Sequence, residues 1–220
     1  MLEPAPSGAS GAEGHHWVPA LGVAGARCVA RVRRTGDLGE TVSMSGGGGR
    51  QPESFVRLRP IVDADVERYV ALQDEEMADR FEWVGPVTVD SMRPVVARWV
   101  ESWERGGAER NYAIIEPSSG DMVGDCELEL RSDGYVHVMY ALFGPWRSKG
   151  FGTQAAALLV SEALQQWPTR PLLFRVHPDN LVSKRVAQRQ GAHLAGIETS
   201  ANGRDLERWV LAFRVDRSTS

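Results

Sequence analysis

The sequence has only two cysteines, Cys28 and Cys126, and neither stands in a spacing that binds a metal or builds a disulfide framework. So few cysteines are typical of a protein in a reducing compartment. No apolar run approaches the roughly 18 residues of a membrane span, and the stretch before Trp17 lacks the basic start of a signal peptide. We therefore expect a cytoplasmic protein with no metal site and no membrane partner.

Lysine is also scarce, and positive charge does not dominate the chain. The formal net charge of −4 argues against a general nucleic-acid binder, so no nucleic-acid partner is expected. A length of 220 residues, with 42% hydrophobic residues and seven Trp, is enough for the core of one domain.

The first part of the chain is rich in glycine and shows no sustained period of 2 or 3.6 residues. We expect residues 1–53 to be a disordered tail, either a genuine flexible arm or an extension upstream of a true start at Met44. Residues 54–215 then form one domain, and residues 216–220 a disordered end.

Hydrophobic periodicity predicts the elements of that domain. A strand at residues 55–61 is followed by a helix that Asp63 or Asp65 caps and that runs through Met77. A second helix covers residues 89–103, and three strands follow it. The chain then continues as helix (153–167), strand, helix and two strands. This order predicts an α/β domain of the α+β type, with a mixed, mostly antiparallel sheet and one later parallel crossover.

The segment RSKGFGT, Arg147 to Thr153, joins a predicted strand to a helix. Gly150 and Gly152 let the backbone close around an oxyanion, and the helix start offers unpaired N–H groups. A P-loop is excluded because its Gly-Lys-Ser/Thr is absent, and the element order disfavours a dinucleotide site. Alone, this segment is equally compatible with a plain turn.

A second motif lies downstream in HPDNLVSKRVAQRQG. Asn180 stands at the start of a predicted helix, Ser183 lies one turn further in, and Gly191 ends the helix. By themselves these residues are typical of an Asn N-cap and a Gly stop.

Together the two motifs resemble the GNAT superfamily of N-acetyltransferases, and the branch that acetylates the N-termini (alanine or serine) of ribosomal proteins in particular. Tyr140 and GFGTQA add to the resemblance, which covers about residues 55–213. It implies a sheet that is splayed where acetyl-CoA binds, flanked by helices. The residues it implies for acetyl-CoA are Leu142, Arg147, Ser148, Lys149, Gly150, Phe151, Gly152, Thr153 and Asn180.

The resemblance also indicates which groups carry the chemistry. Ala187 stands where many members have a Tyr that acts as the general acid. The resemblance therefore implies Ser183 as the acid that protonates the leaving thiolate. His137 stands where the branch often has an acidic residue, and it is the first candidate for the base. Glu127 and Glu129 are the alternatives, while each of the three also fits an ordinary strand position.

The implied function is acetyl transfer from acetyl-CoA to a primary amine, of a protein N-terminus or of a small molecule. A non-catalytic acyl-CoA-binding module of the same fold is the alternative, and a homodimer is possible within the family. An acidic run borders the expected acceptor site, where it either attracts a cationic amine or is simply a solvated helix face; its members are Asp74, Glu75, Glu76, Asp79 and Glu82.

Overall fold

The computed structural model describes residues 56–83 and 85–212, so the predicted tail, the Met44 start and the predicted C-terminal end lie outside the described residues. Within them, seven strands form one sheet in the order β1-β2-β3-β4-β5-β7-β6. The strands are β1 (Arg57–Pro60), β2 (Glu109–Ile115), β3 (Met122–Leu130), β4 (Val136–Leu142), β5 (Leu172–Val176), β6 (His193–Thr199) and β7 (Asp205–Leu211). The α-helices are α1 (Val66–Ala71), α2 (Glu75–Arg80), α3 (Val89–Glu104), α4 (Phe151–Gln166) and α5 (Leu181–Gln188).

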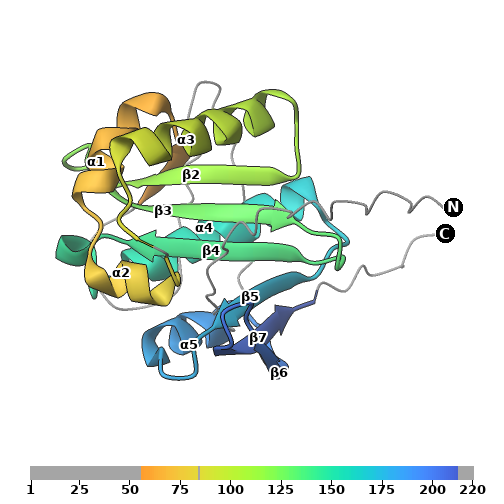
Figure 1. The fold of residues 1–220 in the computed structure, drawn as a ribbon. Coiled ribbons are helices and arrows are strands. Elements are labelled where there is room, and N and C mark those ends of the chain that lie inside the picture. Colours follow the sequence, from red (N-terminus) through yellow and green to blue (C-terminus); the bar gives the residue numbers. More distant parts are fainter. Residues whose placement is uncertain (1–55, 84, 213–220) are drawn as a thin grey trace, which may run out of the picture.

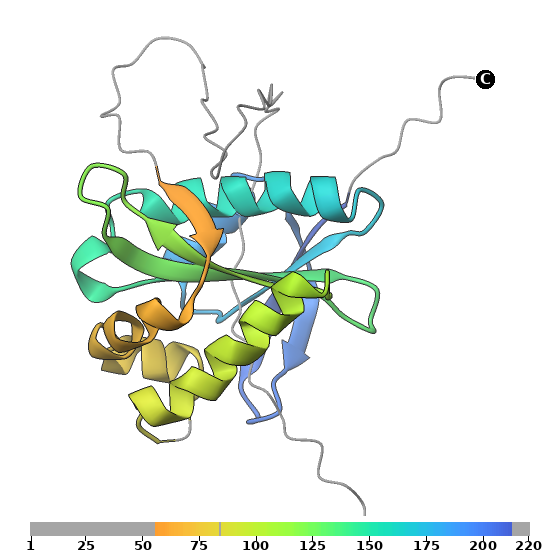
Figure 2. The same cartoon turned by 90° about the horizontal axis from the view of Figure 1, so that it is seen from above.

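The sheet is mixed and mostly antiparallel, which confirms the predicted fold class. Every neighbouring pair is antiparallel except β4 and β5, which the crossover helix α4 connects in parallel. Helices α1, α2 and α3 cover one face of the sheet and α4 covers the other (Figures 1 and 2). This arrangement places one apolar layer on each side of the sheet.

The parallel strands β4 and β5 separate soon after they meet. Their register contains only two pairs, Val136 with Leu172 and His137 with Leu173. Beyond these pairs the two strands share no ladder, so the sheet opens towards the C-terminal end of β4. The opening is the splay that the sequence resemblance implied.

The side chains of β4 alternate between the two apolar layers, as expected of a strand that is buried on both faces. Val138 and Tyr140 belong to the cluster that packs against α4. Ala141, and Phe143 just beyond the strand, belong to the cluster that packs against α1, α2 and α3. The end of β4 therefore offers one set of side chains to each side of the open sheet.

The prediction of one helix through Met77 was wrong. The chain forms two short helices, α1 and α2, with a break between them at residues 72–74. Asp74 has extended backbone angles, and its Oδ1 accepts a hydrogen bond from the N–H of Met77 at 3.0 Å, so it caps a new helix. The apolar pattern continues across the break, which explains why periodicity missed it.

Strands β3 and β4 approach one another very closely near the open end of the sheet. Gly124 pairs with Leu142, and a Cβ atom added to Gly124 would lie 2.1 Å from the carbonyl oxygen of Ala141. Any side chain at this position would have to push the two backbones apart, so glycine is what permits the approach.

Candidate active site

A cavity of about 590 Å³ opens where β4 separates from β5. Helix α2 borders it on one side and helix α5 on the other. Its walls also include the turn that leads into α4. Eight residues predicted from the two motifs line it, namely Leu142, Arg147, Ser148, Gly150, Gly152, Thr153, Asn180 and Ser183. The fold thus brings together two motifs that lie about 30 residues apart in the sequence.

The turn before α4 presents a run of free backbone donors to this cavity. The N–H groups of residues 148–152 make no hydrogen bond within the described part of the chain, whereas the N–H groups of Arg147 and Thr153 bond to carbonyls of the turn. Ser148 and Gly150 both have positive φ angles, 62° and 86°. Successive N–H groups in such a conformation form a concave anion-binding site, which the positive end of the α4 dipole strengthens.

Gly152 is needed for a second reason. A Cβ atom at this position would lie 2.8 Å from Cε2 of Tyr140. The first turn of α4 therefore packs directly on the aromatic ring, with no room for a side chain.

Three of the predicted turn residues do not present a free side chain to the cavity. Phe151 is 2% exposed and its ring lies in the core. Lys149 is exposed and does not line the cavity. Arg147 lines it, but its guanidinium pairs with Asp74 at 2.8 Å and with Glu76 at 2.7 Å, both on or next to α2.

The second motif forms the opposite wall. The side-chain oxygen of Asn180 accepts a hydrogen bond from the N–H of Ser183 at 3.0 Å, so Asn180 caps α5 and also lines the cavity. Ser183 is 5% exposed and lines the cavity in the same wall. Ala187 is fully buried and does not reach the cavity.

His137 lies away from the cavity. It stands four residues before Ala141 on β4, which corresponds to roughly 13 Å along an extended strand. Its Nε2 is 2.8 Å from a carboxylate oxygen of Asp133. Burial lowers the pKa of His137, against the raising effect of the Asp133 carboxylate. This position does not favour His137 as the base, although its role stays a prediction.

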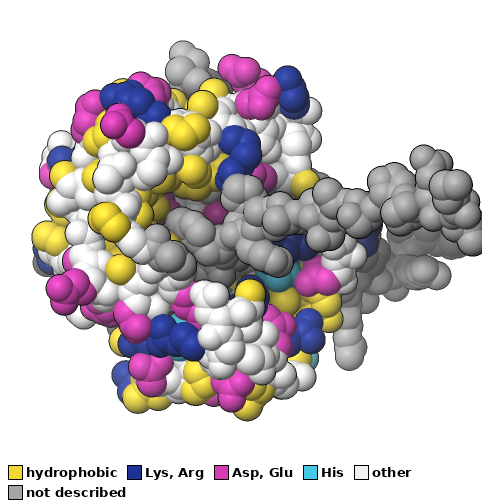
Figure 3. All heavy atoms as spheres, in the orientation of Figure 1, with side chains coloured by type: hydrophobic (Ala, Val, Ile, Leu, Met, Phe, Trp, Pro, Cys, Tyr) yellow, Lys and Arg dark blue, Asp and Glu magenta, His cyan; other side chains and the backbone are white. Residues whose placement is uncertain are grey.

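Two carboxyl groups do lie on the face of β3 that is turned towards α1 and α2. Asp125 pairs in register with Ala141, which lines the cavity, and Glu127 pairs with Met139. Both are buried, and neither has an ion pair among the described residues; one oxygen of Asp125 has no hydrogen-bond partner there either. Burial raises the pKa of Asp125 to about 7 and that of Glu127 to about 8. Figure 3 shows acidic side chains in a hollow on this face.

Comparison with known proteins decides the family. The sequence profile of the Acetyltransferase (GNAT) domain matches residues 56–193. The chain belongs to the GNAT acetyltransferase family. It is therefore an N-acetyltransferase, and GNAT enzymes take their acetyl group from acetyl-CoA. A curated relative, "Probable N-acetyltransferase YjcK" of Bacillus subtilis (strain 168), is 27% identical over 151 residues, or 64% of this chain and 82% of that protein.

Solved GNAT structures share the fold at low sequence identity. RimL, a ribosomal alpha-N-protein acetyltransferase in complex with coenzyme A, superposes with a TM-score of 0.61 at 17% identity and covers 75% of this chain and 97% of its own. A chimera of the spermidine N-acetyltransferase SpeG from Vibrio cholerae and hSSAT gives 0.57 at 18% identity, with coverage of 72% and 96%. Proteins of this fold thus act on protein N-termini and on small amines.

The acidic run of this GNAT domain is largely engaged in ion pairs and hydrogen bonds, so it presents little unpaired charge to an acceptor amine. Asp74 and Glu76 contact Arg147, as described, and Asp79 contacts Arg204 at 3.0 Å. The carboxylate of Glu82 accepts hydrogen bonds from Ser200 and Asn202. Only Glu75 of the five has no ion pair or hydrogen bond from its side chain among the described residues. The sequence gives no sign of these partners because they are 71 to 125 residues away along the chain.

Two further residues of the GNAT cavity were missed by the sequence analysis. His177, just after β5, lines the cavity, and its Nε2 lies 3.0 Å from the carbonyl oxygen of Arg80, to which it donates a hydrogen bond. Tyr140 lines the cavity with a hydroxyl that is buried. Nothing in the spacing of either residue distinguishes it from an ordinary strand residue.

Other kinds of site find no counterpart in residues 56–83 and 85–212. None of the helices there is long and apolar enough to cross a membrane. No three His, Cys, Asp or Glu side chains of these residues are grouped so as to hold a metal ion.

Proposed function

We propose that this GNAT domain transfers the acetyl group of acetyl-CoA to a primary amine that binds as a protonated ammonium. The observation that carries the proposal is the cavity itself, which joins a cradle of free backbone donors to the open end of β4. The donor substrate and the acceptor then meet at the splay, with the donor on the side of α4 and α5 and the acceptor on the side of α2 and β3.

The donor side fits an elongated substrate that ends in a pyrophosphate. The free N–H groups of residues 148–152 bind its phosphate oxygens, with Lys149 adding positive charge from the surface. Arg147 and Thr153 border the same cradle. Asn180 and Leu142 line the cavity between the cradle and the sheet and hold the pantetheine arm. A backbone N–H near Leu142 faces the thioester oxygen, where negative charge develops during attack.

The acceptor side supplies negative charge and a base. Asp125 and Glu127 lie two residues apart on one face of β3, so a single ammonium group can contact both carboxylates. Their buried position without an internal cation costs free energy that a bound ammonium would recover. As a coupled pair with pKa values of about 7 and 8, they can take a proton from the ammonium near neutral pH.

The proton balance is simple. The Asp125 and Glu127 pair takes one proton from the ammonium, and the free amine attacks the thioester carbon. The C–N bond forms and the C–S bond breaks, with its electron pair passing to sulfur. Ser183 donates its hydroxyl proton to that sulfur and recovers the second proton that the nitrogen loses. The products are the amide, the thiol, and one proton that the carboxyl pair returns to water.

Two measurements test this proposal. Acetyl-CoA should raise the melting temperature, whereas NAD should not, because the cradle lacks a dinucleotide fingerprint. Thiol release should then be measured with an alanine-initiated peptide and with spermidine, which distinguish an N-terminal acceptor from a polyamine. Replacing Gly152 with Trp should abolish acetyl-CoA binding, since the side chain would displace the Tyr140 ring; unchanged affinity would contradict the cradle assignment. Binding without thiol release would identify an acyl-CoA-binding module instead.

A further inference from the structure

The hydroxyl of Tyr140 is a buried polar group in the wall of the cavity. Tyr140 is 6% exposed, and within the described part of the chain its hydroxyl completes no hydrogen bond. An unpaired buried hydroxyl costs free energy, and a Phe ring would fill the same space without that cost. Such a group is therefore most simply explained by a partner that forms during function.

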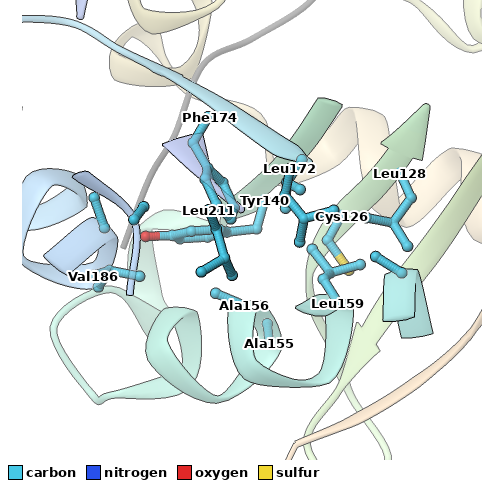
Figure 4. Packing of buried hydrophobic residues seen from close by; sticks show 14 of the residues in the cluster. Cys126, Leu128, Tyr140, Ala155, Ala156, Leu159, Leu172, Phe174, Val186 and Leu211 are labelled. Atoms are coloured by element: carbon cyan, nitrogen blue, oxygen red, sulfur yellow. The ribbon is translucent and has the colours of Figure 1, made fainter. Parts of the chain in front are cut away.

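The ring of Tyr140 is held so that its hydroxyl reaches helix α5. Gly152 lies against one edge of the ring, and a Cβ there would be only 2.8 Å from Cε2. The oxygen of Tyr140 points towards the helix that carries Val186 (Figure 4). The Ser183 hydroxyl on that helix is close enough to lower the pKa of Tyr140, which burial raises, although the two groups do not meet in hydrogen-bonding geometry.

Helix α5 itself has no aromatic hydroxyl to offer. Ala187 is fully buried, and its methyl group lies in the same apolar cluster as the Tyr140 ring. The small side chain at this position leaves α5 packed closely on the sheet. Among the described residues that line the cavity with Ser183, the aromatic hydroxyl belongs to Tyr140 of β4.

We propose that Tyr140 is a positioning residue that donates a hydrogen bond to the Ser183 oxygen and so directs the Ser183 proton at the leaving sulfur. This inference rests on the proposed function. No proton leaves Tyr140, because its hydroxyl remains a donor throughout. The Ser183 oxygen then accepts the hydrogen bond from Tyr140. Its own hydroxyl proton stays free to be donated into the cavity that both residues line.

The variant Tyr140→Phe tests the role of the hydroxyl while keeping the ring. We expect kcat to fall roughly 10- to 100-fold, with the KM for acetyl-CoA almost unchanged. The melting temperature should stay the same or rise, because the variant removes an unpaired buried hydroxyl. Tyr112→Phe is the matched control, because its hydroxyl is also buried and without a hydrogen bond among the described residues but does not line the cavity. The control should leave kcat unaltered. An equal effect of both variants would overturn the assignment.

A double-mutant cycle separates positioning from a general packing effect. If Tyr140 acts through Ser183, Tyr140→Phe should have no further effect on kcat in a Ser183→Ala background. Additive losses would show that Tyr140 acts independently of Ser183 and would overturn the proposal. Acetyl-CoA affinity should be measured by calorimetry on all three variants and on the unaltered protein. Failure of the proposed function would appear as absent binding in the unaltered protein, which is a different result from additive losses in kcat.

Discussion

Asp125 and Glu127 illustrate how single buried residues make the stability of the fold depend on pH. Each is a carboxyl group on a buried strand face, with an apolar residue of β4 beside it. The charged and titratable groups that act on Glu127 are Glu129 and Asp125 of β3 itself, Glu109 of β2, Arg131 just beyond β3 and Tyr69 of α1. The one cation among them pairs with Glu129, so neither buried carboxyl is neutralised. Their burial favours the protonated forms.

The double variant Asp125→Asn with Glu127→Gln should flatten the pH dependence of stability. The folded-state pKa values are raised to about 7 and 8, so the folded chain binds protons that the unfolded chain has already released. The stabilisation is fully present below about pH 4 and is lost as pH rises through 7 and 8. Melting temperatures from pH 5.5 to 8.5 should fall in the unaltered protein and fall less in the variant. Glu75→Gln, the control, removes a carboxyl that has no ion pair or hydrogen bond among the described residues and does not act on either buried acid, so it should keep the unaltered slope.

At the scale of elements, helix α2 is tied to both sides of the open sheet. Arg147 connects it to the turn before α4, while Arg80 pairs with Asp179 at 2.7 Å beside α5. Asp79 pairs with Arg204, in the connection between β6 and β7. Most of these pairs are partly exposed, so each is weak. Together they hold α2 over the acceptor side of the cavity.

Removing one acidic partner of Arg147 should strengthen acetyl-CoA binding. We expect the pyrophosphate to compete with Glu76 for the Arg147 guanidinium, and an exposed pair of this kind is worth about 0.2–1 kcal/mol. Glu76→Gln should therefore lower the dissociation constant by a factor of about 1.5 to 5 at low salt, measured by calorimetry. Asp74 is left in place because it caps α2. Glu75→Gln should change nothing, and an equal gain in both variants would point to net charge as the cause.

At the scale of the whole molecule, the domain consists of two half-sheets that share a short junction. Strands β1 to β4 form one half, and β5, β7 and β6 form the other. Two β4–β5 register pairs, the packing around α4 and the ion pairs of α2 connect them. Leu172 is fully buried in that junction, so its packing helps to set how the two halves meet.

Leu172→Val should therefore affect binding as well as stability. Removing one buried methylene costs about 1 kcal/mol of unfolding free energy. Leu128→Val on β3 removes the same group from an equally buried position away from the junction. Chemical denaturation should show similar losses in both variants. Acetyl-CoA affinity should fall in Leu172→Val alone; equal affinities would show that the junction does not set the geometry of the site.

Sequence patterns predicted the strand and helix order and placed the two motifs because these features are local or follow a fixed period. The break before Asp74 was missed because apolar spacing continues through it, and only the capping geometry reveals it. Asp125 was overlooked because alternating acids in a strand usually indicate a solvated face. Its burial depends on α1, which is packed there by tertiary contacts. The same holds for Tyr140, whose hydroxyl acquires significance only beside Ser183.

The close approach of β3 and β4 at Gly124 provides a sequence pattern that can be searched for in other proteins. No side chain fits between β3 and β4 at Gly124, so this position requires glycine. Together with the two acidic residues that follow, it forms the sequence Gly-Asp-x-Glu, which precedes the Arg-x-x-Gly-x-Gly turn. A search for both strings in one chain should collect enzymes with the acceptor side that we propose here. Acceptors found for any of them could then be tried directly on this protein.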